Sequence, residues 1–225
     1  VFKRCAVCVF SMFSCFVSAH DPHLDLVRAE ALVREKHFSL ARRYSEPAIY
    51  SSALTDQERA RSYYVRAYSF YNQQLFVSAR KDLNRAMEFN PSNPEALYLM
   101  GYLHYFGRGT ERNMSLGFSF FNQAAALDHS ESRFYVGSAK LAGAGVERDQ
   151  VSGIAMLEGL AEEGHVSSML LLAKYYREFR PSTDTRFALQ AEHLYQQALS
   201  LGSHSAALAL AFMYKNGELG ARSLP

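Results

Sequence analysis

Small and apolar residues recur along this chain at the spacing of an α-helix. The clearest pair of faces consists of Phe134, Gly137 and Leu141 in residues 132–141, and of Ile154, Leu157 and Leu160 in residues 150–163. Residues three or four positions apart share one face of a helix. Between the two segments lies Ala-Gly-Ala-Gly-Val, residues 142–146, and glycines just past a helix end can adopt the left-handed backbone that ends it. The pattern therefore predicts a helix, a glycine turn and a second helix.

This unit is repeated along the chain. Three glycines recur with a period of 36 residues, since Gly101, Gly107 and Gly109 reappear as Gly137, Gly143 and Gly145. Asn113 reappears as Asp149, and both can cap the second helix. Ala173 and Ala211 take the place of the first glycine in two further copies, where a small residue lets two helix axes approach. A fixed period of about 20–50 residues is typical of stacked units that bury their apolar faces on one another.

The stretch from residue 94 to 220 resembles Sel1-like repeats, the longer-looped relatives of the tetratricopeptide repeat. The resemblance rests on Leu99-Met100-Gly101 with Phe106-Gly107-Arg108-Gly109, on Val136-Gly137 with Gly143-Ala144-Gly145-Val146 and Asp149, on Glu163-Gly164-His165, on Leu201-Gly202-Ser203-His204, and on Leu210-Ala211-Phe212-Met213-Tyr214 with Asn216-Gly217. Residues 60–93 resemble a tetratricopeptide repeat through Tyr63, Ala67, Phe70, Ala79, Leu83, Ala86 and Pro91. A weaker copy precedes it, because Ala29 and Ala41 share the separation of Ala67 and Ala79.

The resemblance implies an all-α, right-handed solenoid of helix-turn-helix repeats that forms one domain, residues 20–225. The expected repeats are residues 22–59, 60–93, 94–129, 130–165, 166–203 and an incomplete last copy, 204–225. Residues 177–181, Arg-Glu-Phe-Arg-Pro, stand where glycines are expected, so we expect a turn of different shape there. The last copy has no second helix to cover it, which indicates either a fragment of a longer protein or an end that docks onto another molecule.

Residues 1–19 are expected to be a secretory signal peptide. Lys3 and Arg4 form a basic start, residues 5–17 are almost continuously apolar, and Val17-Ser18-Ala19 is a small-residue cleavage site. The apolar run is shorter than the about 20 residues that a spanning helix needs. The sequence therefore predicts an exported protein, periplasmic or secreted, whose mature chain begins at His20, with an uncleaved N-terminal anchor as the alternative.

Removal of this segment changes the composition of the chain. All three cysteines, Cys5, Cys8 and Cys15, lie within it, so the mature chain has neither thiol chemistry nor disulfides. Of the 24 basic residues, Lys3 and Arg4 are lost, which leaves 22 against 22 acidic residues. A balanced charge gives no electrostatic reason to expect nucleic acid or an anionic membrane as a partner.

No catalytic motif occurs in a suitable context, and we expect neither enzymatic activity nor a cofactor or metal. The Gly-x-Gly pair Gly107 and Gly109 follows a predicted helix, whereas the dinucleotide fingerprint follows a strand. His129, His165 and His204 lie at successive turns between repeats. Stacked units are displaced by about 10 Å, too far for these histidines to share one ion, so they are expected to be exposed or capping residues.

The most suggestive candidate site is aromatic. One trio, Tyr64, Tyr68 and Tyr71, lies on the first helix of the repeat that starts at Ala60, and a second trio, Tyr98, Tyr102 and Tyr105, lies on the first helix of the next. Each trio shares one helical face, which differs from the face assigned to the core. The resemblance implies that first helices line the concave surface, where peptides or partner helices dock. The six tyrosines would form a ladder there, with Arg61 and Asn72 as polar neighbours. The alternative is that the rings pack between adjacent helices as ordinary core.

These features together favour a non-catalytic adaptor that holds a peptide, an extended segment or a helix of another envelope or secreted protein on its concave face. Tyrosine suits such a surface because it combines apolar area with a hydroxyl group at low entropic cost. Two alternatives remain open. One is an envelope enzyme or a protein that binds cell-wall ligands, and the other is a structural component that self-associates through its C-terminal end.

Overall fold

The computed structural model describes residues 21–178 and 185–219, and every regular element in these ranges is an α-helix. The helices are α1 (Pro22–Arg34), α2 (Phe38–Tyr50), α3 (Asp56–Asn72), α4 (Phe76–Phe89), α5 (Pro94–Phe106), α6 (Met114–Ala125), α7 (Ser130–Ala142), α8 (Gln150–Glu162), α9 (Val166–Glu178), α10 (Thr185–Ser200) and α11 (His204–Lys215). The predicted signal peptide with its cysteines, and most of the unusual turn after α9, lie outside the described residues.

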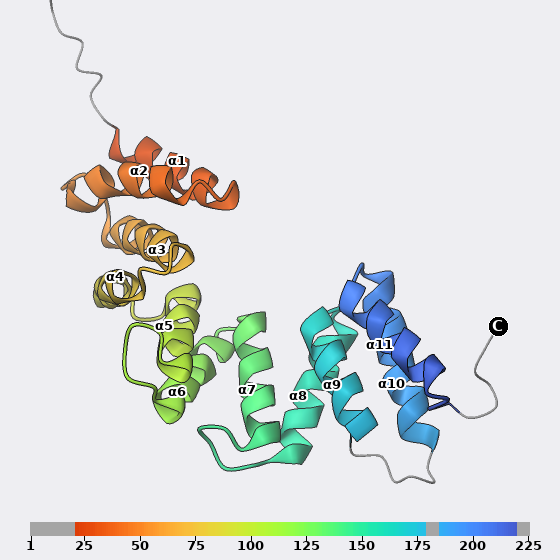
Figure 1. Cartoon of the computed structure of the whole chain (residues 1–225). Coiled ribbons are helices and arrows are strands. Elements are labelled where there is room, and N and C mark those ends of the chain that lie inside the picture. The colour runs from red at the N-terminus through yellow and green to blue at the C-terminus, as the bar shows by residue number, and fades with distance from the viewer. Residues whose placement is uncertain (1–20, 179–184, 220–225) are drawn as a thin grey trace, which may run out of the picture.

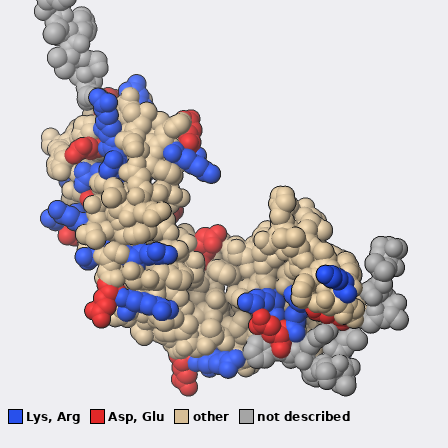
Figure 2. Space-filling view, viewed as in Figure 1, with Lys and Arg blue, Asp and Glu red and all other residues tan. Residues whose placement is uncertain are grey.

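Each helix packs on the next one along the chain, and the helices follow one another along an arc from α1 to α11 (Figure 1). Charged side chains of both signs are scattered over the face seen in Figure 2, with wide uncharged areas between them. The prediction of an all-α solenoid is confirmed. None of the described helices combines the length and the apolar character that a membrane-spanning segment requires.

The helix ends are set by the residues that the repeat pattern identified. The side chains of Asn113 and Asp149 accept hydrogen bonds from backbone amides at the starts of α6 and α8, at 2.9 and 3.0 Å. At the other end of the preceding helices, Gly107 and Gly143 have left-handed backbones with φ of 67° and 73°. A residue with a Cβ is strained in that conformation, which explains the glycines.

Small residues lie where the two helices of a repeat cross. A Cβ atom on Gly153 of α8 would lie 2.8 Å from the backbone nitrogen of Leu141 and 2.9 Å from the carbonyl oxygen of Gly137, both on α7. Ala173 of α9 is likewise fully buried. Ala211 of α11 is different, because its side chain is exposed and no described helix covers it. The prediction that Ala211 lies at a close helix crossing is therefore wrong for the described residues.

The buried apolar residues form three clusters between the helices, and a buried ion pair links α3 to α4. Arg66 of α3 donates two hydrogen bonds to Asp82 of α4, with nitrogen–oxygen distances of 2.6 and 2.8 Å. The side chain of Asp82 is only 6% exposed, and that of Arg66 14%. A buried charge is stabilised only when it is paired, and this ion pair joins α3 to α4.

Candidate functional site

Two adjoining hollows lie where the first helices of the N-terminal repeats meet. The first hollow measures about 620 Å³ and is lined by Glu30, Val33, Arg34, Gln57, Arg61, Tyr64, Val65, Asn90, Asn93, Pro94 and Glu95. The second hollow measures about 480 Å³ and is lined by Val33, Arg34, Lys36, Phe38, Tyr64, Tyr68 and Asn72. Val33, Arg34 and Tyr64 line both, so the two hollows form one groove over α1 and α3 that reaches the start of α5.

Tyr64 and Tyr68 form the aromatic floor of this groove. Both rings are half-buried, their centroids lie 6.0 Å apart, and Tyr68 meets Phe38 edge-on at 6.3 Å. The inner edges of both rings pack on the buried cluster that includes Ala67 and Met100. Burial, followed by the charge of Glu95, raises the pKa of Tyr64 well above its ordinary value. Its phenol is therefore a neutral hydrogen-bond donor at any physiological pH.

The ladder continues across the junction between two repeats. Tyr71 of α3 meets Tyr102 of α5 edge-on, with ring centroids 5.5 Å apart. Tyr102 in turn contacts Phe106 at 4.5 Å and Tyr135 of α7 at 6.2 Å. A series of aromatic contacts thus runs from Tyr64 on α3 through Tyr71 and Tyr102 to Tyr135 on α7.

Tyr98 and Tyr105 lie mainly between helices. Their rings contact the buried ring of Phe121 on α6 at 5.9 and 5.6 Å. Both also contact Tyr135, and the hydroxyl of Tyr105 donates a long hydrogen bond of 3.4 Å to the carbonyl of Ala144. Helix packing, the alternative considered from the sequence, thus accounts for most of the contacts of these two tyrosines.

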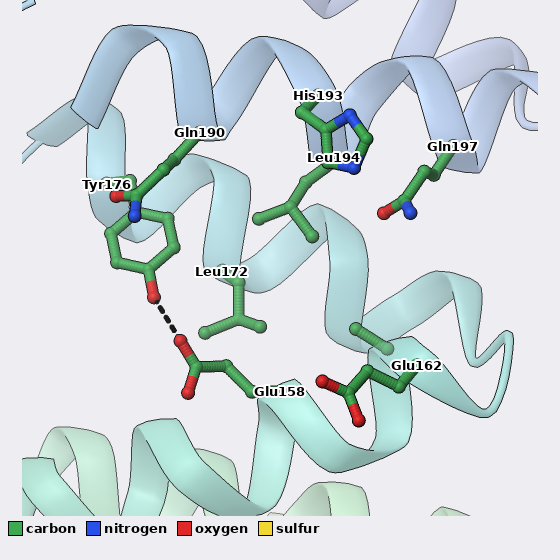
Figure 3. A pocket seen from close by; sticks show the side chains of 9 residues that line it. Glu158, Glu162, Leu172, Tyr176, Gln190, His193, Leu194 and Gln197 are labelled. Carbon is green, nitrogen blue, oxygen red and sulfur yellow. Dashed lines mark hydrogen bonds between the residues drawn. The ribbon is translucent and has the colours of Figure 1, made fainter. Parts of the chain in front are cut away.

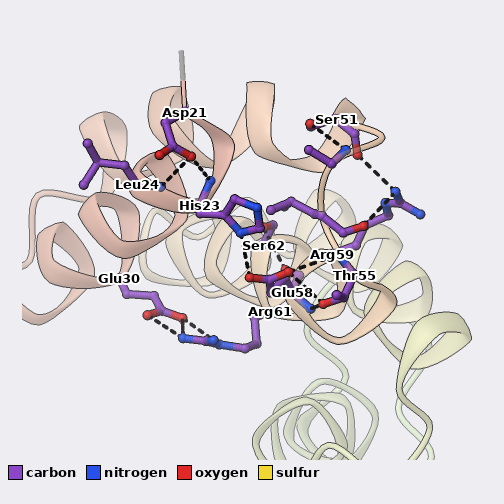
Figure 4. A network of polar contacts seen from close by, with 12 residues as sticks. Asp21, His23, Leu24, Glu30, Ser51, Thr55, Glu58, Arg59, Arg61 and Ser62 are labelled. Carbon is purple, nitrogen blue, oxygen red and sulfur yellow. Dashed lines mark hydrogen bonds and ion pairs between the residues drawn. The ribbon is translucent and has the colours of Figure 1, made fainter. Parts of the chain in front are cut away.

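The two polar neighbours of the ladder lie at the groove as well. Arg61 holds the carboxylate of Glu30 through two hydrogen bonds of 2.9 and 2.8 Å (Figure 4). This pair joins α3 to α1 and leaves little net charge in the first hollow at that point. Asn72 donates through Nδ2 to the carbonyl of Tyr68 at 2.8 Å, which leaves its side-chain oxygen available as an acceptor.

Sequence reasoning missed Val33, Arg34, Phe38 and Tyr135. A usable signal existed for Arg34, because the register that aligns Ala29 with Ala67 also aligns Arg34 with Asn72. The positions of the tyrosines in the second repeat, transferred to the first repeat by this register, fall on the same side of α1 as Arg34. Tyr135 had no such signal, since its neighbours in space come from α5 and α6.

A separate, outer hollow of about 320 Å³ lies over α9 between α8 and α10 (Figure 3). Leu172, Leu194 and Ala161 contribute apolar surface, and Glu162 and His193 lie on opposite walls. The hydroxyl of Tyr176 donates to the carboxylate of Glu158 at 2.7 Å. None of the residues predicted for the partner site lines this hollow.

The histidines at the repeat turns act as helix caps. The Nδ1 atoms of His129 and His165 accept hydrogen bonds from the backbone amides of Ser132 and Ser168, at 3.1 and 3.2 Å. This confirms the capping interpretation for these two residues. At the third turn Ser203 caps the helix instead, and His204 is exposed. Within the described ranges, no three histidine, cysteine or carboxylate side chains are grouped so that they could hold a metal ion.

Stacked helical pairs with a groove over their first helices define an all-α repeat solenoid. The Sel1 repeat family model matches residues 39–69, 94–129, 130–165, 166–203 and 204–223. These matches span well over half of the sequence, so the chain belongs to the Sel1 repeat family. Sel1 repeats generally form scaffolds for protein–protein interaction, and the family is typically non-catalytic.

Two solved structures show the same fold. A Sel1 repeat protein from Oxalobacter formigenes aligns with a TM-score of 0.68 and 21% identity, over 92% of this chain and 83% of that protein. A protective antigen of uropathogenic Escherichia coli strains, which displays an SLR fold, aligns with a TM-score of 0.59 and 19% identity, over 92% of this chain and 52% of the antigen. The chain thus spans about half the length of the antigen. No curated protein matches the sequence.

Proposed function

We propose that this protein is an exported, non-catalytic adaptor that binds an extended segment of a partner protein in the groove over α1 and α3. The observation that carries the proposal is the pair of adjoining hollows floored by Tyr64 and Tyr68. Half-buried tyrosines held by packing lose little entropy on binding, which is why they are frequent at binding hot spots. The hollows also fall within the range of about 300–1,000 Å³ that is common for binding pockets.

Within the predicted ladder, the proposal assigns different parts to different rings. Tyr64, Tyr68, Asn72 and the Arg61–Glu30 pair face the groove and would contact the partner. Tyr71 and Tyr102 extend the surface across the junction between the two repeats. Tyr98 and Tyr105 hold α5, α6 and α7 together and would act through the shape of the scaffold.

A library of random twelve-residue peptides, selected for binding to the purified protein, tests this proposal. Affinities of the selected peptides are then measured for wild type and for Tyr68→Ala. Loss of a hot-spot tyrosine costs about 1.4 kcal/mol or more, which is a loss of affinity of about tenfold. The matched control is Tyr50→Ala, because Tyr50 is 73% exposed on a second helix, α2. Equal affinity for wild type and Tyr68→Ala, in a variant with an unchanged helical spectrum, would contradict the proposal.

Export is the second part of the proposal and rests on residues 1–19 alone. N-terminal sequencing of the protein expressed with its full sequence provides the test. A mature chain that begins at His20 is the expected result, and a retained N-terminus on membrane-associated protein would instead support the anchor.

Self-association is a second candidate function, favoured by the exposed apolar residues of α11. Leu208 is 74% exposed and Phe212 54%, on a helix whose packing partner among the described residues is α10. Two copies could bury these side chains against each other. Light scattering over a range of concentrations should then give a rising mass for wild type and a constant monomer mass for Leu208→Ser.

A further inference from the structure

The second hollow is bordered by positive charge that the protein itself does not neutralise. Arg34, at the end of α1, and Lys36, in the turn that follows, both line this hollow, and both are exposed. Neither has an ion-pair partner among the described residues. The lining of the second hollow contains no carboxylate. Glu35 stands between the two cations in the sequence, but its side chain does not line the hollow.

The adjoining first hollow has a different balance of charge. There Arg61 is occupied by Glu30, and Glu95 adds a carboxylate at the α5 end. Arg34 lines both hollows, whereas Lys36 lines the second alone. The first hollow therefore has carboxylates beside its cations, and the second has cations without a carboxylate.

Tyrosine hydroxyls and apolar side chains line the hollow beside these two cations. The hydroxyls of Tyr64 and Tyr68 have no hydrogen-bond partner within the part of the chain that the structure describes. Val33 and Phe38 provide the apolar lining beside them. A carboxylate accepts hydrogen bonds from cations and phenols alike, and such charge-assisted bonds are the strong ones.

The two positive charges occur at this turn in the first repeat and not in the second, although the two turns have the same backbone conformation. The register that aligns Ala29 with Ala67 pairs Arg34 with Asn72 and Lys36 with Gln74. Lys36 and Gln74 both have left-handed backbones, with φ of 63° and 60°. The amides of both also bond to the carbonyl three residues earlier, at 3.0 and 2.9 Å. The two turns therefore differ in their side chains and not in their backbone.

We propose that the second hollow binds an aspartate or glutamate side chain that lies next to an apolar residue in an extended segment of the partner protein. This inference rests on the proposed function, because it names the chemistry of the segment that occupies the groove. The carboxylate would lie between Arg34 and Lys36 and accept from the tyrosine hydroxyls. The neighbouring apolar side chain would cover Phe38 and Tyr68.

The repeat itself supplies variants that preserve the turn. Arg34→Asn combined with Lys36→Gln installs the residues that the second repeat has at the equivalent positions. In the peptide selection described above, wild type should enrich aspartate and glutamate over lysine and arginine. The Arg34→Asn/Lys36→Gln protein should lose that enrichment, and Arg34→Glu/Lys36→Glu should reverse it. Lys140→Gln and Lys174→Gln on α7 and α9, far from the groove, are the matched controls and should leave it unchanged.

One selected peptide, synthesised with both ends blocked so that only side-chain carboxylates remain, provides the quantitative test. Changing its acidic residue to the amide should weaken binding to wild type about tenfold, as expected when a charge-assisted hydrogen bond is lost. The same change should have little effect on binding to the Arg34→Asn/Lys36→Gln protein. Added salt should weaken the acidic peptide more than the amide, since exposed charges are screened.

The outcomes separate this inference from the proposed function. If Tyr68→Ala abolishes binding while the amide and acidic peptides bind equally well, a partner segment occupies the groove but the acidic site is refuted. If selected peptides bind independently of Tyr68, binding in the groove is refuted, and the acidic site is refuted with it. Dependence on both Tyr68 and the two cations supports both proposals.

Discussion

Gly153 offers a direct test of how closely the helices of one repeat must approach. A Cβ atom at this position of α8 would lie 2.8 Å from the backbone nitrogen of Leu141 and 3.1 Å from its Cα. These are backbone atoms of α7, so no side chain can rotate away to make room. Gly159 is on the same helix, and a Cβ there would meet no atom within 4 Å. The substitution Gly→Ala at these two positions should therefore have opposite effects on the free energy of unfolding.

The magnitudes follow from two competing terms. Alanine gains about 0.5–1 kcal/mol over glycine inside a helix because the unfolded chain has less backbone freedom to lose. At residue 159 this is the only term, so Gly159→Ala should stabilise the protein by about that amount. At residue 153, overpacking costs about 1–3 kcal/mol, and the rigid backbone contact favours the upper part of the range. The net effect of Gly153→Ala should be a loss of about 1–2 kcal/mol.

Urea unfolding followed by circular dichroism measures both effects in one experiment. A repeat protein can unfold in parts, so the slope of the transition must be compared before midpoints are converted to free energies. We expect the midpoint to fall for Gly153→Ala and to rise for Gly159→Ala with the slope unchanged. A rise in both midpoints would show that α7 and α8 are not in the close contact described here.

Three further predictions concern buried or hydrogen-bonded ionisable groups. Arg66→Ala leaves the buried carboxylate of Asp82 unpaired and should destabilise the protein by about 3–5 kcal/mol, measured by urea unfolding. The double variant Arg66→Met/Asp82→Leu should restore most of the lost stability, because neither charge is then left buried alone. Hydrogen bonds from the side chain and backbone of Thr55, and then from His23, lower the pKa of Glu58 from 4.5 to about 2. The stability that Glu58 contributes is therefore present above pH 4.5 and lost as the pH falls towards 2, so the urea midpoints of wild type and Glu58→Gln should converge over that interval. Burial raises the pKa values of Tyr64 and Tyr98 above 10.0. The folded state therefore loses stability as the pH rises beyond 10.0, and ultraviolet titration should show phenols that ionise only on unfolding.

The fold was predictable because local rules determine most of it. The glycine at each left-handed helix end and the polar cap at each helix start, such as Gly143 and Asp149, can be recognised from the sequence and its period. Ala211 shows the limit of this reasoning. Its place in the repeat predicts a helix crossing, but burial at that position depends on a second helix, and none of the described residues forms one over it.

The candidate site was predictable only in part. Spacing along one helix places Tyr64 and Tyr68 on a common face, and the structure puts that face in a groove. Tyr98 and Tyr105 belong to a trio with the same spacing as Tyr64, Tyr68 and Tyr71, yet their rings pack against Phe121 and Tyr135 from the following helices. Periodicity specifies the direction in which a side chain leaves its helix. It does not specify the size of the neighbour that it meets.

Photo-crosslinking from the groove tests the central claim most directly. The photoreactive residue p-benzoylphenylalanine replaces Tyr68 in one protein and Val151, an 82% exposed residue on α8, in another, and each is irradiated with a labelled peptide from the selection. We expect a crosslinked product from position 68 and none from position 151. Equal labelling at both positions, or labelling at position 151 alone, would contradict it.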